Sequence, residues 1–348
     1  MKKKKIAVLF GGCSTEYQVS LQSAYAVITH INQEKYQVIL IGLSKETGQW
    51  FWYQGDPQRI QEDTWLRAED CTPVYVPTDR NVQGLFYLDD EKIQILSLDQ
   101  VLPILHGKNG EDGTVQGALA LSALPVLGCG VLSSALCMDK ELSHRVVAQQ
   151  GILVPRSFRL EKPYDAQMVS ACTKSLGYPL FVKPVRSGSS YGIARVEKEE
   201  EVFPAIEQAF LHDTIVILEE AIEGREVGCA VLGTKVLQTG EVDEIVLSQG
   251  FFDFTEKYTL KTSKIQVPAH VSKEISETIK KTACVIYQAL GCSGFARVDL
   301  FLTEDNQLYF NEVNTIPGFT AHSRFPNMLK AAGYTFEEII EQILEEQP

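Results

Sequence analysis

The chain has 348 residues, of which 45% are hydrophobic and 22% charged, and its formal net charge is −13. This length and composition indicate a globular protein of two or three domains with buried cores. The negative charge argues against a nucleic-acid partner, because nucleic-acid binders usually carry a basic surface.

Two further features bear on where the protein works. Four lysines at residues 2–5 precede an apolar run, as in a secretion signal, but Gly11 and Gly12 end that run too early. No apolar stretch is long enough to cross a membrane. Eight cysteines are present without a C-x-x-C pair, which is typical of free thiols in a reducing compartment. We therefore expect a cytoplasmic protein with no membrane partner.

The first part of the chain alternates buried strands with helices. The expected elements are strand 5–10, helix 20–31, strand 36–43, strand 93–105 and helix 113–124. A glycine turn links the first strand to the first helix, and this order is typical of a doubly wound α/β sheet. Residues 50–92 are irregular and polar, which indicates an excursion that contains a hairpin.

Two more units follow. In the second unit we expect helix 142–150, helix 166–176, strand 180–184, strand 193–196, helix 202–210 and strand 215–219. In the third unit we expect strand 226–232, strand 242–246, helix 272–290, a hairpin and a C-terminal helix at 335–346. The loop at 249–267 is long, and loops of this length often serve as lids.

The predicted hairpin carries a group of polar side chains. Its turn is centred after Asp305, which places Asp299 opposite Glu312 on the paired strands. The same register places Arg297 opposite Asn314, and directly paired residues share one face of a sheet. Oxygen ligands beside an arginine suit Mg²⁺ that holds nucleotide phosphates. A solvated polar face is the competing interpretation.

A loop rich in serine and glycine follows Lys183 and ends at Gly192. Its amides and hydroxyls can surround phosphate oxygens, and Lys183 supplies a positive charge. A plain turn is the alternative, because serine and glycine favour turns. The carboxylates from Glu219 to Glu226 can accept hydrogen bonds from a ribose or an adenine, although a solvated acidic linker explains them equally well.

Three other loops each carry one candidate group. His106 follows a strand, at the edge where open α/β sheets bind ligands, although a single histidine there is more often structural. Glu16, in the first glycine-rich loop, can hold a small ammonium group, whereas its neighbours Ser14 and Thr15 can simply cap a helix. Lys257 in the long loop can reach a phosphate, or it is a solvated lysine beside an apolar plug.

Taken together, eight segments resemble the D-alanine–D-alanine ligase family of ATP-grasp enzymes. They occur in the family's order from residue 11 to residue 324, so the resemblance covers nearly the whole chain. The segments are GGCSTEYQVSL, LHGKNGEDGTVQG, GCGVLSSALCMDK, KPVRSGSSYG, EGREV, FFDFTEKY, ARVDLF and NEVNTIPGFTAHSR. Each is modest alone, but eight in order are highly specific.

The resemblance implies an α/β protein with an N-terminal doubly wound parallel sheet domain and a two-lobed ATP-grasp unit. The implied boundaries are 1–139 for the N-terminal substrate domain, 140–222 for the central lobe, and 223–348 for the C-terminal lobe with its lid loop at 249–267. ATP phosphorylates the carboxylate of D-alanine, and the amine of a second D-amino acid attacks that acylphosphate. The implied cofactors are ATP and two Mg²⁺, with Mn²⁺ as an alternative. The family also favours a homodimer formed through the N-terminal domain.

The matching positions receive roles from the same resemblance. Glu16 is implied to bind the ammonium group of D-alanine. Ser189 and Tyr258 are implied to join Glu16 in a hydrogen-bonded triad that latches the lid. His106, steadied by Glu111, is implied to face the first substrate.

Arg297 and the amide of Gly318 are implied to stabilise the oxyanion of the tetrahedral intermediate. The residues implied to contact ATP are Lys140, Lys183, Glu219, Glu220, Ile222, Glu226 and Lys257. The residues implied to bind the metal ions are Asp299, Glu312 and Asn314.

Two departures from the family pattern concern the second substrate. The lid motif has Phe252 where many relatives have tyrosine, and Arg324 stands where they have an apolar residue after a serine, here Ser323. Both changes resemble the vancomycin-resistance ligases that make D-alanyl-D-serine, and the whole chain is most similar to their VanG type. Ser323 is implied to meet the carboxylate of the second substrate, and Asp243 is the nearest acidic candidate to pair with Arg324.

Three hypotheses remain open at this point. The first is a D-alanine–D-serine ligase, the second is an ordinary D-alanine–D-alanine ligase, and the third is an ATP-binding regulator without catalysis. The full set of candidate lysine, arginine and metal-binding positions argues against the regulator, because a regulator has no need for all of them. The first two hypotheses differ only in whether D-serine or D-alanine is the preferred second substrate.

Overall fold

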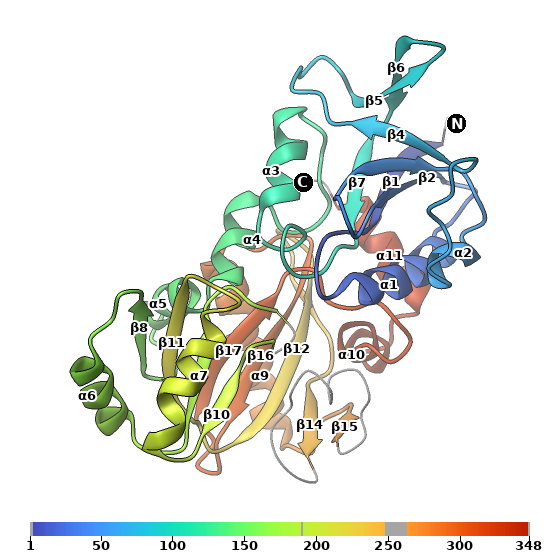
Figure 1. Ribbon diagram of the computed structural model, residues 1–348. Helices are drawn as coiled ribbons and strands as arrows, with labels where there is room; N and C mark the ends of the chain where they lie inside the picture. The colour runs from blue at the N-terminus through green and yellow to red at the C-terminus, as the bar shows by residue number, and fades with distance from the viewer. Residues whose placement is uncertain (1–2, 189–190, 248–262, 347–348) are drawn as a thin grey trace.

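Three β-sheets organise the protein, and a computed structural model describes residues 3–188, 191–247 and 263–346. The sheets have seven, four and six strands, and each is built from one continuous part of the chain. Figure 1 shows the N-terminal sheet above the other two, which form separate lobes below it. Among the described residues, no helix is both long and apolar enough to cross a membrane.

The first sheet has the strand order β6–β5–β4–β3–β2–β1–β7. Its strands are β1 (Lys4–Gly11), β2 (Tyr36–Leu43), β3 (Trp50–Tyr53), β4 (Cys71–Tyr75), β5 (Gly84–Asp89), β6 (Lys92–Ser97) and β7 (Gln100–Pro103). The helices of this part are α1 (Tyr17–His30), α2 (Gln58–Gln61), α3 (Thr114–Leu121) and α4 (Val131–Met138). Strand β1 pairs in parallel with β2 and β7, as the buried strands of the sequence predict.

Residues 50–92 form more structure than the expected excursion. Strands β3, β4 and β5 extend the sheet through antiparallel pairs, and the hairpin of this part joins β5 to β6, which begins at Lys92. The single strand expected over 93–105 is therefore wrong: this segment divides into β6 at one edge of the sheet and β7 beside β1. Strands β4, β5 and β6 are short and mostly half-exposed, so their sequences lack the continuous apolar run that marks β1 and β2. That is why the pattern indicates irregular structure where the chain forms a sheet edge.

The central lobe contains the four-stranded sheet in the order β10–β9–β11–β8. Its elements are β8 (Ser157–Glu161), α6 (Ala166–Leu176), β9 (Leu180–Pro184), β10 (Ala194–Val196), the 3₁₀ helix η1 (Glu199–Glu201), α7 (Val202–Ala209) and β11 (Ile215–Glu220). Its buried apolar side chains form a core of their own, between the sheet and the helices α6 and α7. Helix α5 (Lys140–Ala148) precedes these elements in the chain, and its Val147 is buried in the core of the C-terminal lobe.

The C-terminal lobe contains the third sheet, in the order β15–β14–β12–β16–β17, with β13 paired to β12. Its elements are β12 (Arg225–Leu232), β13 (Gln238–Thr239), β14 (Asp243–Leu247), β15 (Ser263–Gln266), α9 (Lys273–Ala289), β16 (Phe295–Leu302), β17 (Leu308–Asn314), α10 (Arg324–Ala331) and α11 (Phe336–Glu345). Helix α10 was not predicted, because Pro326 suggests a helix break. The proline lies in the first helical turn, where its missing N–H costs no hydrogen bond.

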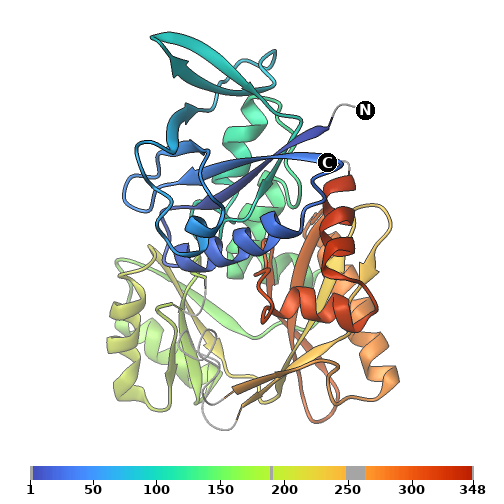
Figure 2. The same cartoon turned by 90° about the vertical axis from the view of Figure 1, so that its right-hand side faces the viewer.

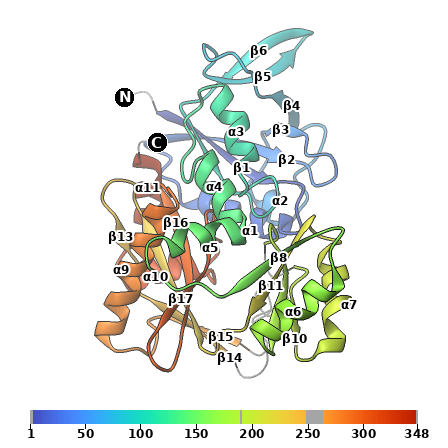
Figure 3. The same ribbon diagram turned by 90° about the vertical axis from the view of Figure 1, so that its left-hand side faces the viewer.

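The C-terminal lobe packs against the N-terminal sheet through a shared apolar core. Ile6 and Leu21 from the first sheet and its helix belong to one buried cluster with Phe319 and Ile339. Figure 2 shows α11 beside α1 on this side of the molecule, and Figure 3 shows the central lobe across a gap from the C-terminal lobe. The N-terminal unit and the C-terminal lobe therefore form one packed body.

Candidate active site

The hairpin of β16 and β17 has the predicted register. Asp299 pairs with Glu312, and Arg297 pairs with Asn314. A β-bulge follows, because the next pair joins Leu300 to residue 310 and leaves residue 311 unpaired. Near the turn the pairing is therefore shifted by one residue from the prediction, with Leu302 opposite Leu308. The bulge removes this shift, so Asp299 still lies opposite Glu312.

Asp299 is the centre of this polar face and is 1% exposed. Arg297 donates from Nε to Oδ1 at 2.8 Å and from Nη2 to Oδ2 at 2.7 Å, and the amide of Asn314 donates to Oδ2 at 3.0 Å. Burial alone would lower the pKa of Arg297, but the carboxylate of Asp299 raises it above its usual value. Arg297 is therefore permanently charged beside a buried carboxylate.

The oxygen chemistry of this face fits a divalent cation in part. Asp299 and Glu312 offer carboxylates, and the side-chain amide of Asn314 can turn to present its oxygen. In the described part of the chain, no three histidine, cysteine, aspartate or glutamate side chains are arranged to hold a metal. A magnesium ion at this hairpin would therefore need further oxygens, which nucleotide phosphates supply in other enzymes.

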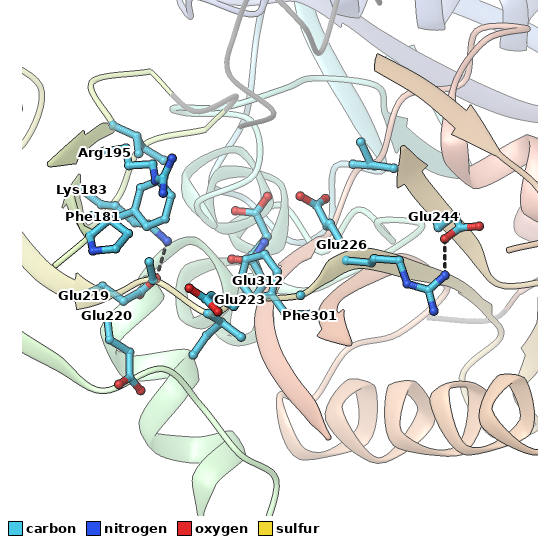
Figure 4. A pocket seen from close by; sticks show the side chains of 18 of the residues that line it. Phe181, Lys183, Arg195, Glu219, Glu220, Glu223, Glu226, Glu244, Phe301 and Glu312 are labelled. Carbon is cyan, nitrogen blue, oxygen red and sulfur yellow. Dashed lines mark hydrogen bonds and ion pairs between the residues drawn. The ribbon is translucent and has the colours of Figure 1, made fainter. Parts of the chain in front are cut away.

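A cavity of about 650 Å³ lies between the central and C-terminal lobes, within the usual size range of ligand pockets. Figure 4 shows Lys183 and Glu219 at one end of it and Glu244 at the other. Its lining includes all six of the predicted ATP contacts that lie within the described residues: Lys140, Lys183, Glu219, Glu220, Ile222 and Glu226. Glu312 also lines this cavity. The size and the mixed charges suit a nucleotide.

Two buried lysines approach this cavity from different elements. Lys183, on β9, forms an ion pair with Glu219 on β11. Lys140 begins α5, donates to the carbonyl of Ser187 at 2.7 Å and lies 3.7 Å from Glu312. The second oxygen of Glu219 is buried and has no hydrogen-bond partner among the described residues. It is an acceptor that a nucleotide hydroxyl or amine could satisfy.

The other acidic candidates of this region have different partners. Glu220 accepts from Nε of Arg156 at 2.6 Å, and in Figure 4 its carboxylate points away from Lys183. Glu226 accepts from Nη1 of Arg324 at 2.8 Å. Of these carboxylates, Glu219 is therefore the one most directly placed beside a cavity lysine.

His106 and Glu111 both bond to the backbone of Ile316, but their contacts differ from those predicted. The ring of His106 is held by the carbonyl of Ile316 at 2.8 Å and by the hydroxyl of Ser23 at 3.3 Å. Glu111 instead accepts from the backbone N–H of Gly107 at 2.8 Å and of Ile316 at 3.1 Å. Glu111 thus steadies His106 only indirectly, because its carboxylate bonds to these two backbone N–H groups and not to the imidazole.

Burial shapes the charge of both groups. It lowers the pKa of His106 to about 4, and the positive charge of Arg297 acts in the same direction. The imidazole is therefore neutral near neutral pH. Burial, followed by the negative charge of Glu16, raises the pKa of Glu111 well above its usual value.

Glu16 lies where three parts of the chain meet. It is 8% exposed, and its carboxylate is packed against Gly107. A Cβ added to Gly188 would come within 2.6 Å of the same carboxylate, so the serine–glycine loop of the central lobe reaches Glu16. The predicted partners Ser189 and Tyr258 lie outside the described residues, as do Phe252 and Lys257 of the lid motif.

The segment after β17 returns to the N-terminal unit. The N–H of Phe319 donates to the hydroxyl of Ser23 at 3.2 Å, and Gly318 packs against the hydroxyl of Ser323. The Ser323 hydroxyl also accepts from the N–H of Thr320 at 3.0 Å. Ser23 was missed in the sequence, where it is one more small residue on the buried face of α1.

Arg324 is buried in an ionic network. Its Nε and Nη2 donate to the two oxygens of Asp243 at 2.7 and 2.8 Å, so the predicted pair is present. Nη1 donates to Glu226 and lies 3.4 Å from Asp299. Burial by itself would lower the pKa of Arg324, but Asp243 and then Asp299 raise it well above its usual value. The side chain connects the cavity lining to the polar face of the hairpin.

The fold and the site together define an ATP-grasp ligase. The chain belongs to the D-alanine–D-alanine ligase family: the family's N-terminal domain matches residues 5–129 and its C-terminal domain matches residues 146–345. A D-alanine–D-alanine ligase of Caldicellulosiruptor bescii is 40% identical, covering 99% of this chain and 95% of its own length. The vancomycin C-type resistance protein VanC2 of Enterococcus casseliflavus is also 40% identical, over 98% of this chain and 97% of its own.

Among solved structures, the VanG D-Ala:D-Ser ligase from Enterococcus faecalis is 51% identical to this chain. It superposes with a TM-score of 0.92 and covers 99% of both chains. The relatives therefore include ligases with different second substrates, and the family alone does not choose between them.

Proposed function

We propose that this enzyme joins D-alanine to D-serine at the expense of ATP and so makes D-alanyl-D-serine. The observation that carries the proposal is Arg324, a charged side chain held by Asp243 beside the segment that begins at Gly318. The similarity to the VanG D-Ala:D-Ser ligase supports the same choice. Such a dipeptide would enter altered peptidoglycan precursors and confer vancomycin resistance.

In the first half of the reaction, ATP occupies the cavity between the lobes. Lys140 and Lys183 balance the phosphate charge, and the free oxygen of Glu219 accepts from the nucleotide. Lys257 of the lid adds a third positive charge. The carboxylate of D-alanine, whose ammonium group Glu16 binds, takes the γ-phosphoryl group and becomes an acylphosphate. Asp299, Glu312 and Asn314 would hold magnesium, which would neutralise charge at the phosphates.

In the second half, the amine of the second amino acid attacks the acylphosphate carbonyl. Arg297 and the amide of Gly318 stabilise the oxyanion, and phosphate then leaves. Neutral His106 faces the first substrate without adding a charge, because its pKa is held near 4. The protein's main contribution is to hold both reactants in place and to balance charge.

The choice of D-serine follows from the chemistry of Arg324. Its guanidinium has five N–H donors, and the hydrogen bonds described above use three of them. A remaining donor can meet the hydroxyl of D-serine. With D-alanine, the same buried donor would stay unpaired, which is the kind of mismatch that gives discrimination of up to ~10⁴. The family resemblance adds Phe252 as a candidate, because phenylalanine in place of tyrosine removes a phenol hydroxyl.

An ordinary D-alanine–D-alanine ligase is the competing function, and the relative from C. bescii carries that name. The test is mass spectrometry of the dipeptides formed from equal D-alanine and D-serine with Mg²⁺ and ATP near neutral pH. We expect D-alanyl-D-serine to dominate. A dominant D-alanyl-D-alanine product would reject the serine assignment but keep the ligase, and no phosphate release with either amino acid would reject both.

A further inference from the structure

Gly228 lies in the middle of the network around Arg324. It sits on the central strand β12, where it pairs with Asp243 of β14 on one side and with Asp299 of β16 on the other. Directly paired residues share a face, so both carboxylates extend over the position where a side chain at residue 228 would stand. Arg324 approaches the same face from α10.

The space above Gly228 is already filled. A Cβ added there would lie 2.5 Å from Nη2 of Arg324, 2.7 Å from Oδ1 of Asp243 and 2.9 Å from Oδ1 of Asp299. Each of these separations is well below carbon–nitrogen or carbon–oxygen contact distance. The network therefore occupies the volume that every residue other than glycine would need.

These three side chains cannot easily move away. Asp243 is 0% exposed, Asp299 is 1% exposed and Arg324 is 5% exposed. They are also bonded to one another, since Arg324 donates to Asp243 at 2.7 and 2.8 Å and lies 3.4 Å from Asp299. Shifting any one of them would leave a buried charge with a poorer partner, which is costly.

A glycine in the interior of a strand is otherwise unfavourable, since it adds backbone entropy to the unfolded chain and offers no side chain to pack. Gly228 lies between Val227 and Cys229, both 0% exposed, in a strand that pairs on both sides. The close approach of three side chains gives the position a physical reason to be glycine.

We propose that Gly228 is a specificity-determining position: its missing side chain makes the room in which Arg324 is held for the second substrate. The proposal rests on the proposed function, in which Arg324 selects D-serine. Gly228 itself touches no substrate and acts by positioning Arg324. Any side chain at this position would displace the guanidinium from Asp243 and so weaken the preference for D-serine.

The test compares four purified full-length variants with the wild type: Gly228→Ala, Arg324→Met, the double variant of both, and Gly117→Ala. Gly117 is the matched control, because it has no atom within 4 Å of an added Cβ and does not have a left-handed backbone. The measurement is the ratio of D-alanyl-D-serine to D-alanyl-D-alanine made from equal amounts of the two amino acids, with kcat and KM for D-serine determined separately.

We expect Gly228→Ala to lower the product ratio about tenfold, mainly through a higher KM for D-serine. Gly117→Ala should leave the ratio unchanged. The double variant should match Arg324→Met alone, because residues that act through one interaction give non-additive effects. A folded Gly228→Ala variant with the wild-type ratio would overturn the proposal, and so would additive losses in the double variant.

If Gly228→Ala does not fold, melting temperatures decide. A triple variant that also carries Arg324→Met and Asp243→Ala lacks the two nearest side-chain atoms that the new methyl group would meet, and it strands no charge at residue 243. It should regain a folded state, and a triple variant that stays unfolded would overturn the proposal. Failure of the proposed function is visible separately, because the wild type would then make little D-alanyl-D-serine before any glycine is changed. In that case the specificity role of Gly228 falls with it.

Discussion

Replacing Arg324 with methionine would test how much the fold depends on the buried network. Arg324 is 5% exposed and Asp243 is fully buried. The change would remove both hydrogen bonds, of 2.7 and 2.8 Å, that Asp243 receives from the guanidinium. Removing one partner of a buried ion pair costs about 3–5 kcal/mol, because the other charge is left uncompensated. We expect a loss of that size in the free energy of unfolding.

A second change should reverse most of this loss. Asp243→Asn in the Arg324→Met background removes the stranded charge, and a neutral amide is far cheaper to bury than a carboxylate. The double variant should therefore recover at least half of the lost stability. Its selectivity for D-serine should stay as low as that of Arg324→Met, because the guanidinium is still absent.

The control is a partly exposed ion pair in the same lobe. Lys280 lies 2.9 Å from Glu241, whose side chain is 31% exposed. Lys280→Met should cost less than about 1 kcal/mol, as exposed pairs usually do. Urea unfolding of the nucleotide-free protein, followed by circular dichroism, measures all three variants. A cost for Arg324→Met no larger than that for Lys280→Met would refute the network as a stabilising element.

Three further outcomes follow from the site. His106 has a pKa near 4 in the folded protein and 6.5 when unfolded. Its contribution to the free energy of unfolding is therefore complete above pH 6.5 and is lost as pH falls toward 4, by up to about 3 kcal/mol. The melting temperature of His106→Gln should fall less steeply across this range than that of the wild type. Lys183→Met should raise the KM for ATP at least about tenfold. Adding Glu219→Gln to that variant should restore the melting temperature of the wild type, but the KM for ATP should stay raised. Glu312→Gln should raise the Mg²⁺ concentration for half-maximal phosphate release about tenfold while leaving the melting temperature close to that of the wild type.

The hairpin illustrates how much the sequence could predict. Alternating residues and a polar turn were enough to place Asp299 opposite Glu312, because side-chain direction in a strand has a period of two. The bulge at Asn311 was not predictable, since nothing local marks one extra residue in β17. Contacts from distant elements hold the bulge. A ring nitrogen of His144 lies 2.8 Å from the carbonyl oxygen of Asn311, and the N–H of Phe310 donates to the carbonyl of Leu153.

The ionic network shows where local patterns stop being informative. Arg324 and Asp243 are 81 positions apart, and only the order of strands in the sheet brings them together. Their pairing was predicted by starting from the family resemblance and taking Asp243 as the nearest acidic candidate. The role of Gly228 needed the structure, although a glycine inside an apolar strand is a usable sign of close approach.

The charge balance of this network also bears on how a metal ion would bind there. Asp299 already faces two guanidinium groups, because Arg297 donates to both of its oxygens and Arg324 lies 3.4 Å from one of them. A divalent ion placed at this carboxylate alone would meet that positive charge in a buried setting, where repulsion is strong. The negative phosphates of a nucleotide remove the obstacle, because they offset the guanidinium charge and supply the missing oxygen ligands. On this reasoning a metal ion at Asp299 would bind together with the nucleotide, and a cation alone would be repelled by the arginines that hold the carboxylate in place.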